Sequence, residues 1–186
     1  MGWSLSWAAI KEAKATAVHS ILGVKPTQRY EESPESDVTG VELPTGWYLV
    51  VFNRQEIKDE VLKKLSMLGD TVYCFVEDHV MFSCAAGWRN GMRTWSLVHD
   101  CEKGIYHLAI GGVAPPSLKE IHNRLTSEQN VAGGEKADVD YIYDAPAELA
   151  KELTGFRHDL DIPGLTGDVF EVLERSPRSL LRRIFG

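Results

Sequence analysis

The stretch FSCAAGWRNGMRTWSLVH, residues 82–99, carries the strongest local signal for the fold. Asn90 and Gly91 form the dipeptide preferred in two-residue type I′ hairpin turns, and β-forming residues lie on both sides of it. If these two residues form the turn, Trp88 faces Arg93. The next pairs along the ladder are then Ala86–Trp95, Cys84–Leu97 and Phe82–His99. The sequence therefore predicts an antiparallel hairpin with one aromatic and apolar face.

The hairpin belongs to a longer β-rich region. Four runs of β-branched and aromatic residues, separated by short turn signals, predict a four-strand meander: residues 72–76, 80–88, 92–98 and 105–110. Towards the N-terminus, large apolar residues alternate with serines over residues 3–7, which predicts a strand with one buried and one solvated face. Residues 47–52 are apolar at every position, as in a central strand that is covered on both sides.

Helical patterns occur between and after these strands. Apolar residues at helical spacing, with start and stop signals at their ends, predict four helices: residues 13–22 ended by Gly23, residues 57–68, a helix opened by the capping box of Ser117 and Glu120, and a helix from its cap Asp144 to Gly155. The polar residues 28–40 are expected to be a solvated loop, and residues 156–174 are expected to be irregular chain packed on the domain.

These elements predict an α+β fold. We expect a single domain over residues 1–174, with a mixed or antiparallel sheet of about six strands and helices mainly on one face. The chain has 186 residues, of which 44% are hydrophobic and 25% charged, as is usual for globular proteins. A chain of this length can bury a full core, so we expect no cofactor and no metal to be needed for folding.

Residues 175–186 differ from the rest of the chain in charge. They hold four arginines and no acidic residue, so they contribute +4 to the net charge of −7 and leave −11 on residues 1–174. Apolar residues at helical spacing beside the arginines predict a basic amphipathic tail. Three interpretations are open: a helix that folds back onto the acidic surface, a contact with a partner or a membrane surface, or a frayed end.

The composition also indicates a compartment and excludes some partners. The three cysteines, Cys74, Cys84 and Cys101, are an odd number in a chain without a secretory signature, which disfavours a disulfide framework and favours a reducing cytoplasm. Residues 1–10 are apolar but lack a basic region and a cleavage site, and no run is long enough to span a membrane. The pI of about 5.4 argues against nucleic acid, because phosphate binding requires a basic surface.

The candidate catalytic residues are His99, Asp100, Cys101 and His107. A cysteine beside a histidine can act as a nucleophile, because the imidazole takes the thiol proton. However, adjacent residues in a strand point to opposite faces, which favours the alternative of turn residues with a partly buried cysteine. No recognised zinc spacing is present, and the acidic pairs are explained as turns and caps, so we expect no metal site. Residues 157–159, Arg-His-Asp, are a further ambiguous cluster.

The candidate partner-binding residues are acidic side chains and a hairpin tip. They are Glu31, Glu32, Glu35, Asp37, Glu77, Asp78, Trp88 and Arg89. The carboxylates would face a basic protein, and Trp88 beside Arg89 would be an exposed anchor of the kind that dominates interfaces. The alternatives for Trp88 are a place in the aromatic core and a local cation–π pair with Arg93.

Several motifs together resemble a family of small bacterial proteins without an assigned function. They are MGWSLSW at residues 1–7, LPTGWY at 43–48, GWRNG to WSLVHD at 87–100 and ELAKELTGF at 148–156. The resemblance covers about residues 1–174 and implies a fold rather than a chemistry. In size, acidity and lack of a catalytic signature the chain also resembles toxin-neutralising immunity proteins as a class.

The expected function is therefore non-enzymatic binding of a protein partner in the cytosol. The sequence contains no phosphate-binding loop, no dinucleotide fingerprint and no hydrolase signature, which disfavours the common enzyme classes. The alternative is a small enzyme or ligand-binding protein that uses the region from His99 to His107. A basic partner that meets the acidic surface is the form of binding that we expect first.

Overall fold

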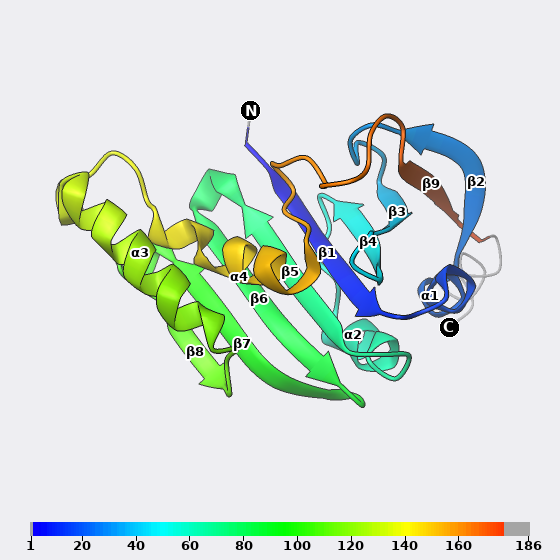
Figure 1. Ribbon diagram of the computed structural model, residues 1–186, viewed down its shortest axis with the longest axis horizontal. Coiled ribbons are helices and arrows are strands. Elements are labelled where there is room, and N and C mark those ends of the chain that lie inside the picture. Colours follow the sequence, from blue (N-terminus) through cyan, green and yellow to red (C-terminus); the bar gives the residue numbers. More distant parts are fainter. Residues whose placement is uncertain (1, 177–186) are drawn as a thin grey trace.

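The computed structural model of the chain describes residues 2–176. These residues form one antiparallel sheet of nine strands in the order β2-β9-β3-β4-β1-β5-β6-β7-β8, together with four α-helices (Figure 1). The strands are β1 (Ser4–Lys11), β2 (Val24–Glu31), β3 (Val38–Glu42), β4 (Trp47–Asn53), β5 (Thr71–Glu77), β6 (Phe82–Arg89), β7 (Met92–Asp100), β8 (Ala109–Gly112) and β9 (Phe170–Arg175). The helices are α1 (Ala15–Leu22), α2 (Asp59–Leu65), α3 (Ser117–Val131) and α4 (Ala145–Thr154). The α+β class is confirmed, with nine strands in place of about six.

Helices cover both faces of the sheet. Leu5, Trp7 and Ala9 of β1 belong to a core with α3 and α4, whereas Ala8 and Ile10 belong to a second core with α1 and α2. The expectation of helices mainly on one face is therefore wrong. The expectation of a solvated face on the first strand is also wrong, because β1 lies between β4 and β5 in the middle of the sheet. The hydroxyl of the fully buried Ser6 is satisfied by the carbonyl oxygen of Gln55 at 2.7 Å.

Three strands lie in regions that the sequence predicted to be loop. Residues 28–40 contain the end of β2 and most of β3, and residues 156–174 contain most of β9, which pairs with both of them. β2 is an edge strand with mostly exposed side chains, so its sequence, VKPTQRYE, has no apolar alternation. Pro26 is tolerated there because an edge strand need not donate every ladder hydrogen bond.

The meander β5-β6-β7-β8 and the central strand over residues 47–52 are confirmed, but the fourth strand of the meander begins at Ala109 and not at residue 105. Asn90 and Gly91 both have positive φ, 49° and 76°, as a type I′ turn requires, and Trp88 pairs with Arg93. Beyond this pair a β-bulge shifts the register by one residue, so that Gly87 faces Trp95. A Cβ on Gly87 would lie 2.0 Å from Trp95 Nε1, so only glycine leaves room for the indole.

The bulge separates the residues that were expected to share one apolar face. Trp95 and Leu97 pack in the core with α3 and α4, and Trp88 and Ala86 pack in the core with α1 and α2. The predicted pairs Ala86–Trp95, Cys84–Leu97 and Phe82–His99 are therefore wrong. The observed partners are Ala86–Ser96, Cys84–Val98 and Phe82–Asp100.

The ends of the helices agree with the sequence in part. Gly23 and Gly155 adopt the left-handed conformation that ends α1 and α4, with φ of 67° and 88°. Neither Ser117 nor Asp144 makes the expected side-chain cap, and the carboxylate of Asp144 instead pairs with Arg157. The C-terminal region was expected to separate at residue 175, but Arg175 is the last residue of β9. Residues 177–186 of the predicted tail lie outside the described residues. Within residues 2–176, no helix has the length and apolarity needed to cross a membrane.

Candidate functional site

The predicted catalytic residues lie where β7 ends and the chain turns toward β8. His99 is fully buried, and its Nδ1 donates a hydrogen bond to the carbonyl oxygen of His107 at 2.8 Å. Its Nε2 lies 3.0 Å from Oδ2 of Asp140. The backbone N–H of Asp100 donates to Nδ1 of His107 at 3.1 Å. The two imidazoles therefore hold the end of β7 to the loop before β8 and to the segment before α4.

Cys101 has no activating base in this arrangement. Its thiol donates to the carbonyl oxygen of Val80 at 3.2 Å, and no hydrogen bond joins it to either histidine within residues 2–176. Burial, and then the carboxylates of Asp140 and Asp100, raise the pKa of the Cys101 thiol. A raised pKa keeps the thiol protonated at neutral pH, which is the opposite of what a cysteine nucleophile requires. The described residues contain no group of three or more histidine, cysteine, aspartate or glutamate side chains placed to hold a metal ion.

The predicted hairpin anchor is a core residue. Trp88 is only 4% exposed, so the expectation of an exposed aromatic at the hairpin tip is wrong. It is buried because the β6–β7 tip packs against the end of α2, where the N–H of Asn90 donates a hydrogen bond to the carbonyl oxygen of Ser66 at 3.1 Å. Arg93 lies 5.9 Å above the indole, as the cation–π alternative predicts. Arg89 is exposed and donates two hydrogen bonds to the carboxylate of Asp70.

Glu77 and Asp78 have structural partners. Glu77 accepts hydrogen bonds from the hydroxyl of Ser4 and from the backbone N–H of His79, and these interactions lower the pKa of its carboxyl. Asp78 accepts from the N–H of Trp3 at 2.7 Å and from the Tyr143 hydroxyl at 2.5 Å. Both carboxylates therefore fix the end of β5 against the N-terminus and the segment before α4.

Residues 32–37 form the turn that joins β2 to β3, and most of the acidic residues predicted to bind a partner lie at this turn. Glu31 uses its carboxylate inside the turn, where it accepts from the N–H groups of Glu35 and Ser36. Glu32, Glu35 and Asp37 are exposed, and their side chains make no hydrogen bond or ion pair with the rest of the described chain. Of the predicted partner-binding residues, these three carry charge that the described fold leaves uncompensated.

A pocket of about 340 Å³ opens beside this turn. One wall is formed by Glu32, Ser33 and Pro34, and the other by the segment that joins α4 to β9. Figure 1 shows this segment, coloured orange, as it runs from α4 past the N-terminal end of β1 to β9, beside the β2–β3 turn. Residues 155–169 contain no helix or strand, and connections of this length in a compact domain are uncommon and often functional.

The pocket combines an apolar floor with an acidic mouth. Its apolar lining includes Phe156, Ile162 and Phe170, and the first and last of these rings pack edge to face with centroids 6.2 Å apart. Its acidic lining is Glu32 on one wall and Asp161 on the other, and both are exposed. An apolar body with a polar or charged end is the kind of group that such a site accepts.

Arg157 holds the pocket segment in place. Its guanidinium lies 3.0 Å from Asp144, 3.3 Å from Glu148 and 2.7 Å from Asp159, and its side chain is only 12% exposed. This network ties the start of the segment to the beginning of α4. Because three carboxylates already surround Arg157, its charge is not available to neutralise the mouth of the pocket.

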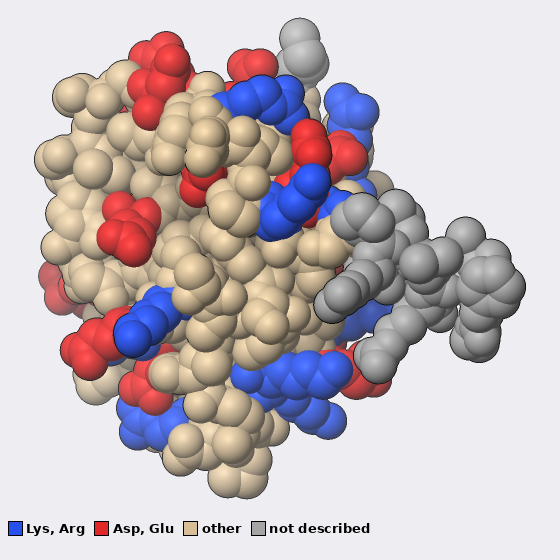
Figure 2. Space-filling view, turned by 90° about the vertical axis from the view of Figure 1, so that its right-hand side faces the viewer, with Lys and Arg blue, Asp and Glu red and all other residues tan. Residues whose placement is uncertain are grey.

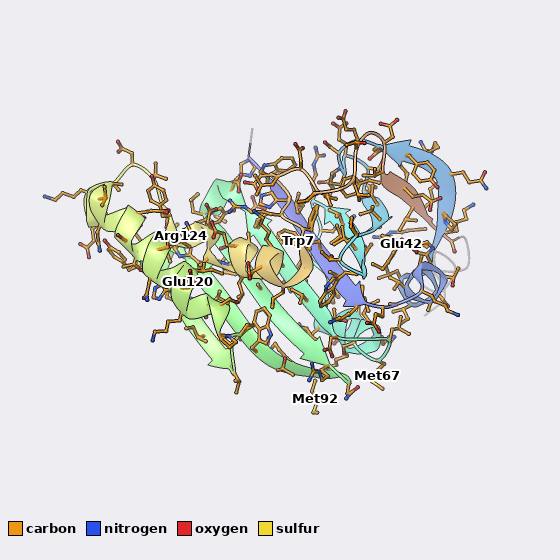
Figure 3. The ribbon with its side chains drawn as sticks, in the orientation of Figure 1. Trp7, Glu42, Met67, Met92, Glu120 and Arg124 are labelled. Atoms are coloured by element: carbon orange, nitrogen blue, oxygen red, sulfur yellow. The ribbon has the colours of Figure 1, made fainter. Side chains whose placement is uncertain are left out.

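His158 also lines the pocket, and it packs against two tryptophans. Its ring centroid lies 5.5 Å from those of both Trp3 and Trp7, and its side chain is 6% exposed (Trp7 is labelled in Figure 3). Two ring nitrogens here, His158 Nδ1 and Trp7 Nε1, are buried without a hydrogen-bond partner. Burial lowers the pKa of His158, so the ring is neutral near pH 7 and adds no positive charge to the pocket.

The two walls of the pocket hold an unusual share of the negative charge. Residues 31–37 and 158–169 together contain seven carboxylates and no lysine or arginine, in a chain with 27 acidic and 20 basic residues. By contrast, the side of the molecule that carries β2 mixes both signs of charge, as Figure 2 shows and as the ion pair between Arg29 and Glu174 illustrates. The sequence marked residues 31–37 as acidic and residues 157–159 as an ambiguous cluster, but it gave Asp161 and Asp168 no role. The insertion of β9 beside β3 brings the two segments together. Comparisons of the chain with protein-family models, with curated proteins and with solved structures find no match.

Proposed function

We propose that the protein is a non-enzymatic, cytosolic binding protein whose acidic pocket receives a basic protein partner. The observation that supports this proposal most directly is the concentration of uncompensated carboxylates on both walls of one pocket. Glu32 and Asp161 line the pocket, and the two segments that form its walls hold three more exposed acidic side chains, Glu35, Asp37 and Asp168. None of these five has an ion pair within residues 2–176. Carboxylates that no cation neutralises raise the negative potential of a concave site, which attracts and orients a basic partner.

The architecture supports a binding role for a second reason. The pocket lies on a turn and a long connection, both held by a sheet that is buried on two faces, which is the usual relation of a recognition site to its scaffold. Leu160, which is 46% exposed, and the partly buried Leu165 and Val169 line the pocket with apolar surface, so an occupant would gain from burial as well as from charge. The resemblance to immunity proteins in size and acidity makes a basic toxin the partner class that we propose first.

The experiment is affinity capture with the full chain as bait, followed by identification of the captured proteins by mass spectrometry. A rim variant removes five negative charges by Glu32→Gln, Glu35→Gln, Asp37→Asn, Asp161→Asn and Asp168→Asn. A control variant removes five exposed, unpaired charges elsewhere by Glu12→Gln, Glu60→Gln, Glu102→Gln, Glu120→Gln and Glu152→Gln. Glu120, for example, lies on α3, which does not line the pocket (Figure 3).

We expect wild type and control to capture the same basic protein and the rim variant to lose it. The loss should amount to about tenfold or more in affinity, because several charge-assisted contacts disappear together. Equal loss in both variants would mean that only net charge matters, and undiminished capture by the rim variant would contradict the proposal.

A further inference from the structure

The pocket also limits which part of a basic partner can enter it. A volume of about 340 Å³ is at the lower end of the range for small-molecule sites, so the pocket suits one side chain rather than an extended ligand. The acidic groups are at the mouth and the buried aromatic groups are on the floor. An occupant must therefore carry its positive charge together with an apolar or planar surface.

We propose that the pocket between Glu32 and Asp161 binds the guanidinium of an arginine side chain from the partner. This inference rests on the proposed function and specifies the group that is recognised. The two carboxylates line the pocket from opposite walls and have no other partner in the described chain, so both are available as acceptors for a donor that enters it. Guanidinium has five N–H donors in a fixed fork, which matches two acceptors better than an ammonium does.

The floor favours the same group. Phe156 and Phe170, which are 2% and 4% exposed, make the floor aromatic, and guanidinium packs well on aromatic rings because it is planar and weakly hydrated. His158 is a second observation that points to a ligand, independent of the acidic side chains. It lines the pocket with an almost fully buried side chain, and its Nδ1 has no hydrogen-bond partner. A neutral imidazole brings no positive charge that would repel an entering cation.

No cation of the pocket's own walls competes for this place. Residues 31–37 and 158–169 contain no lysine or arginine, and Arg157 is already bound to three carboxylates. Since like charges on the two walls repel each other, an entering cation relieves that repulsion as well as gaining its own contacts.

The test is a nuclear magnetic resonance titration of the full, isotopically labelled chain. The probes are Nα-acetyl-arginine amide, its neutral isostere Nα-acetyl-citrulline amide, Nα-acetyl-lysine amide and calcium chloride. We expect arginine amide to give saturable shifts of the amides of residues 32–34 and 156–170, with an affinity about fivefold higher than that of lysine amide. Citrulline amide should give no saturable shift, and calcium should not displace arginine amide.

Variants decide whether the carboxylates act as proposed. Glu32→Gln with Asp161→Asn should weaken arginine amide by about fivefold or more, and Glu120→Gln with Glu152→Gln should leave it unchanged. Equal binding of arginine and citrulline amides, saturable binding of calcium in place of arginine, or undiminished binding to the rim double variant would each overturn the inference. If a basic protein is captured through the rim carboxylates while arginine amide does not bind, the inference fails and the proposed function stands. If arginine amide binds but capture does not depend on the rim, the proposed function fails.

Discussion

Replacement of Arg157 should be the most destabilising change among the charged residues around the pocket. Arg157→Met keeps most of the apolar stem but leaves Asp144, Glu148 and Asp159 facing one another without their shared cation. Removal of one partner from a fully buried pair costs 3–5 kcal/mol, and an exposed pair contributes about 1 kcal/mol or less. Because Arg157 is 12% exposed and its partners are 22% to 34% exposed, we expect a loss of about 2–3 kcal/mol.

The assay is urea unfolding at neutral pH and again near pH 4. Burial already raises the pKa of the Asp144 carboxyl and Arg157 opposes that rise, so removing the guanidinium moves the pKa further above its unfolded value. Protonation then favours the folded variant, so its deficit should shrink as the pH falls. The control is Arg29→Met, which breaks an exposed ion pair with Glu174 and should cost about 0.5 kcal/mol or less. A deficit for Arg157→Met no larger than that of the control, or one that does not shrink in acid, would refute the reasoning.

Three further predictions concern packing and pH. Gly87→Ala should cost about 1–3 kcal/mol in chemical denaturation, because the new Cβ would lie 2.0 Å from Trp95 Nε1, and a loss below about 0.5 kcal/mol would mean that the bulge accommodates a methyl group. Leu97→Ala should cost about 3 kcal/mol and Ile110→Ala less than about 0.5 kcal/mol, since the first side chain is fully buried and the second is 54% exposed; equal values would contradict the burial of Leu97 in the core. His158 binds its proton less readily in the folded than in the unfolded state, so its contribution destabilises the fold as the pH falls below about 6.5. Unfolding free energies of wild type and His158→Phe between pH 7 and 5 should diverge in slope, and parallel curves would show that the ring is not buried neutral.

The parts of the fold that the sequence predicts correctly are those with strong local signals. Two of these signals are residues that tolerate positive φ: Asn90 and Gly91 in the turn, and the glycine that ends α4. The third is the uniformly apolar run over residues 47–52, which fits only a strand that is buried on both faces. The register beyond the turn could not be predicted, because the bulge places Gly87 against the indole of Trp95 on the next strand, and this fit has no local sequence signal. The alternating serines of residues 3–7 gave a wrong prediction of a solvated face for a similar reason. The hydroxyl of Ser6 donates to the carbonyl oxygen of Gln55, which lies far along the chain.

The candidate site could not be predicted either, because it depends on contacts between distant segments of the chain. The sequence marked residues 31–37 as acidic and residues 157–159 as an ambiguous cluster, but it predicted that both segments were loop or irregular chain. It had no signal that β9 enters the sheet between β2 and β3, because the polar edge strand β2 lacks an apolar pattern. The pairing of β9 with its neighbours turns two acidic segments into the two walls of a pocket.

The measurement that tests the central claim most directly is the affinity of the captured partner for wild type, the rim variant and the charge-matched control at low and physiological ionic strength. We predict that the rim variant binds about tenfold or more weakly and that its affinity depends less on salt, whereas the control behaves like wild type. Equal affinities and equal salt dependence for the rim variant and the control would contradict a role for the acidic pocket in binding.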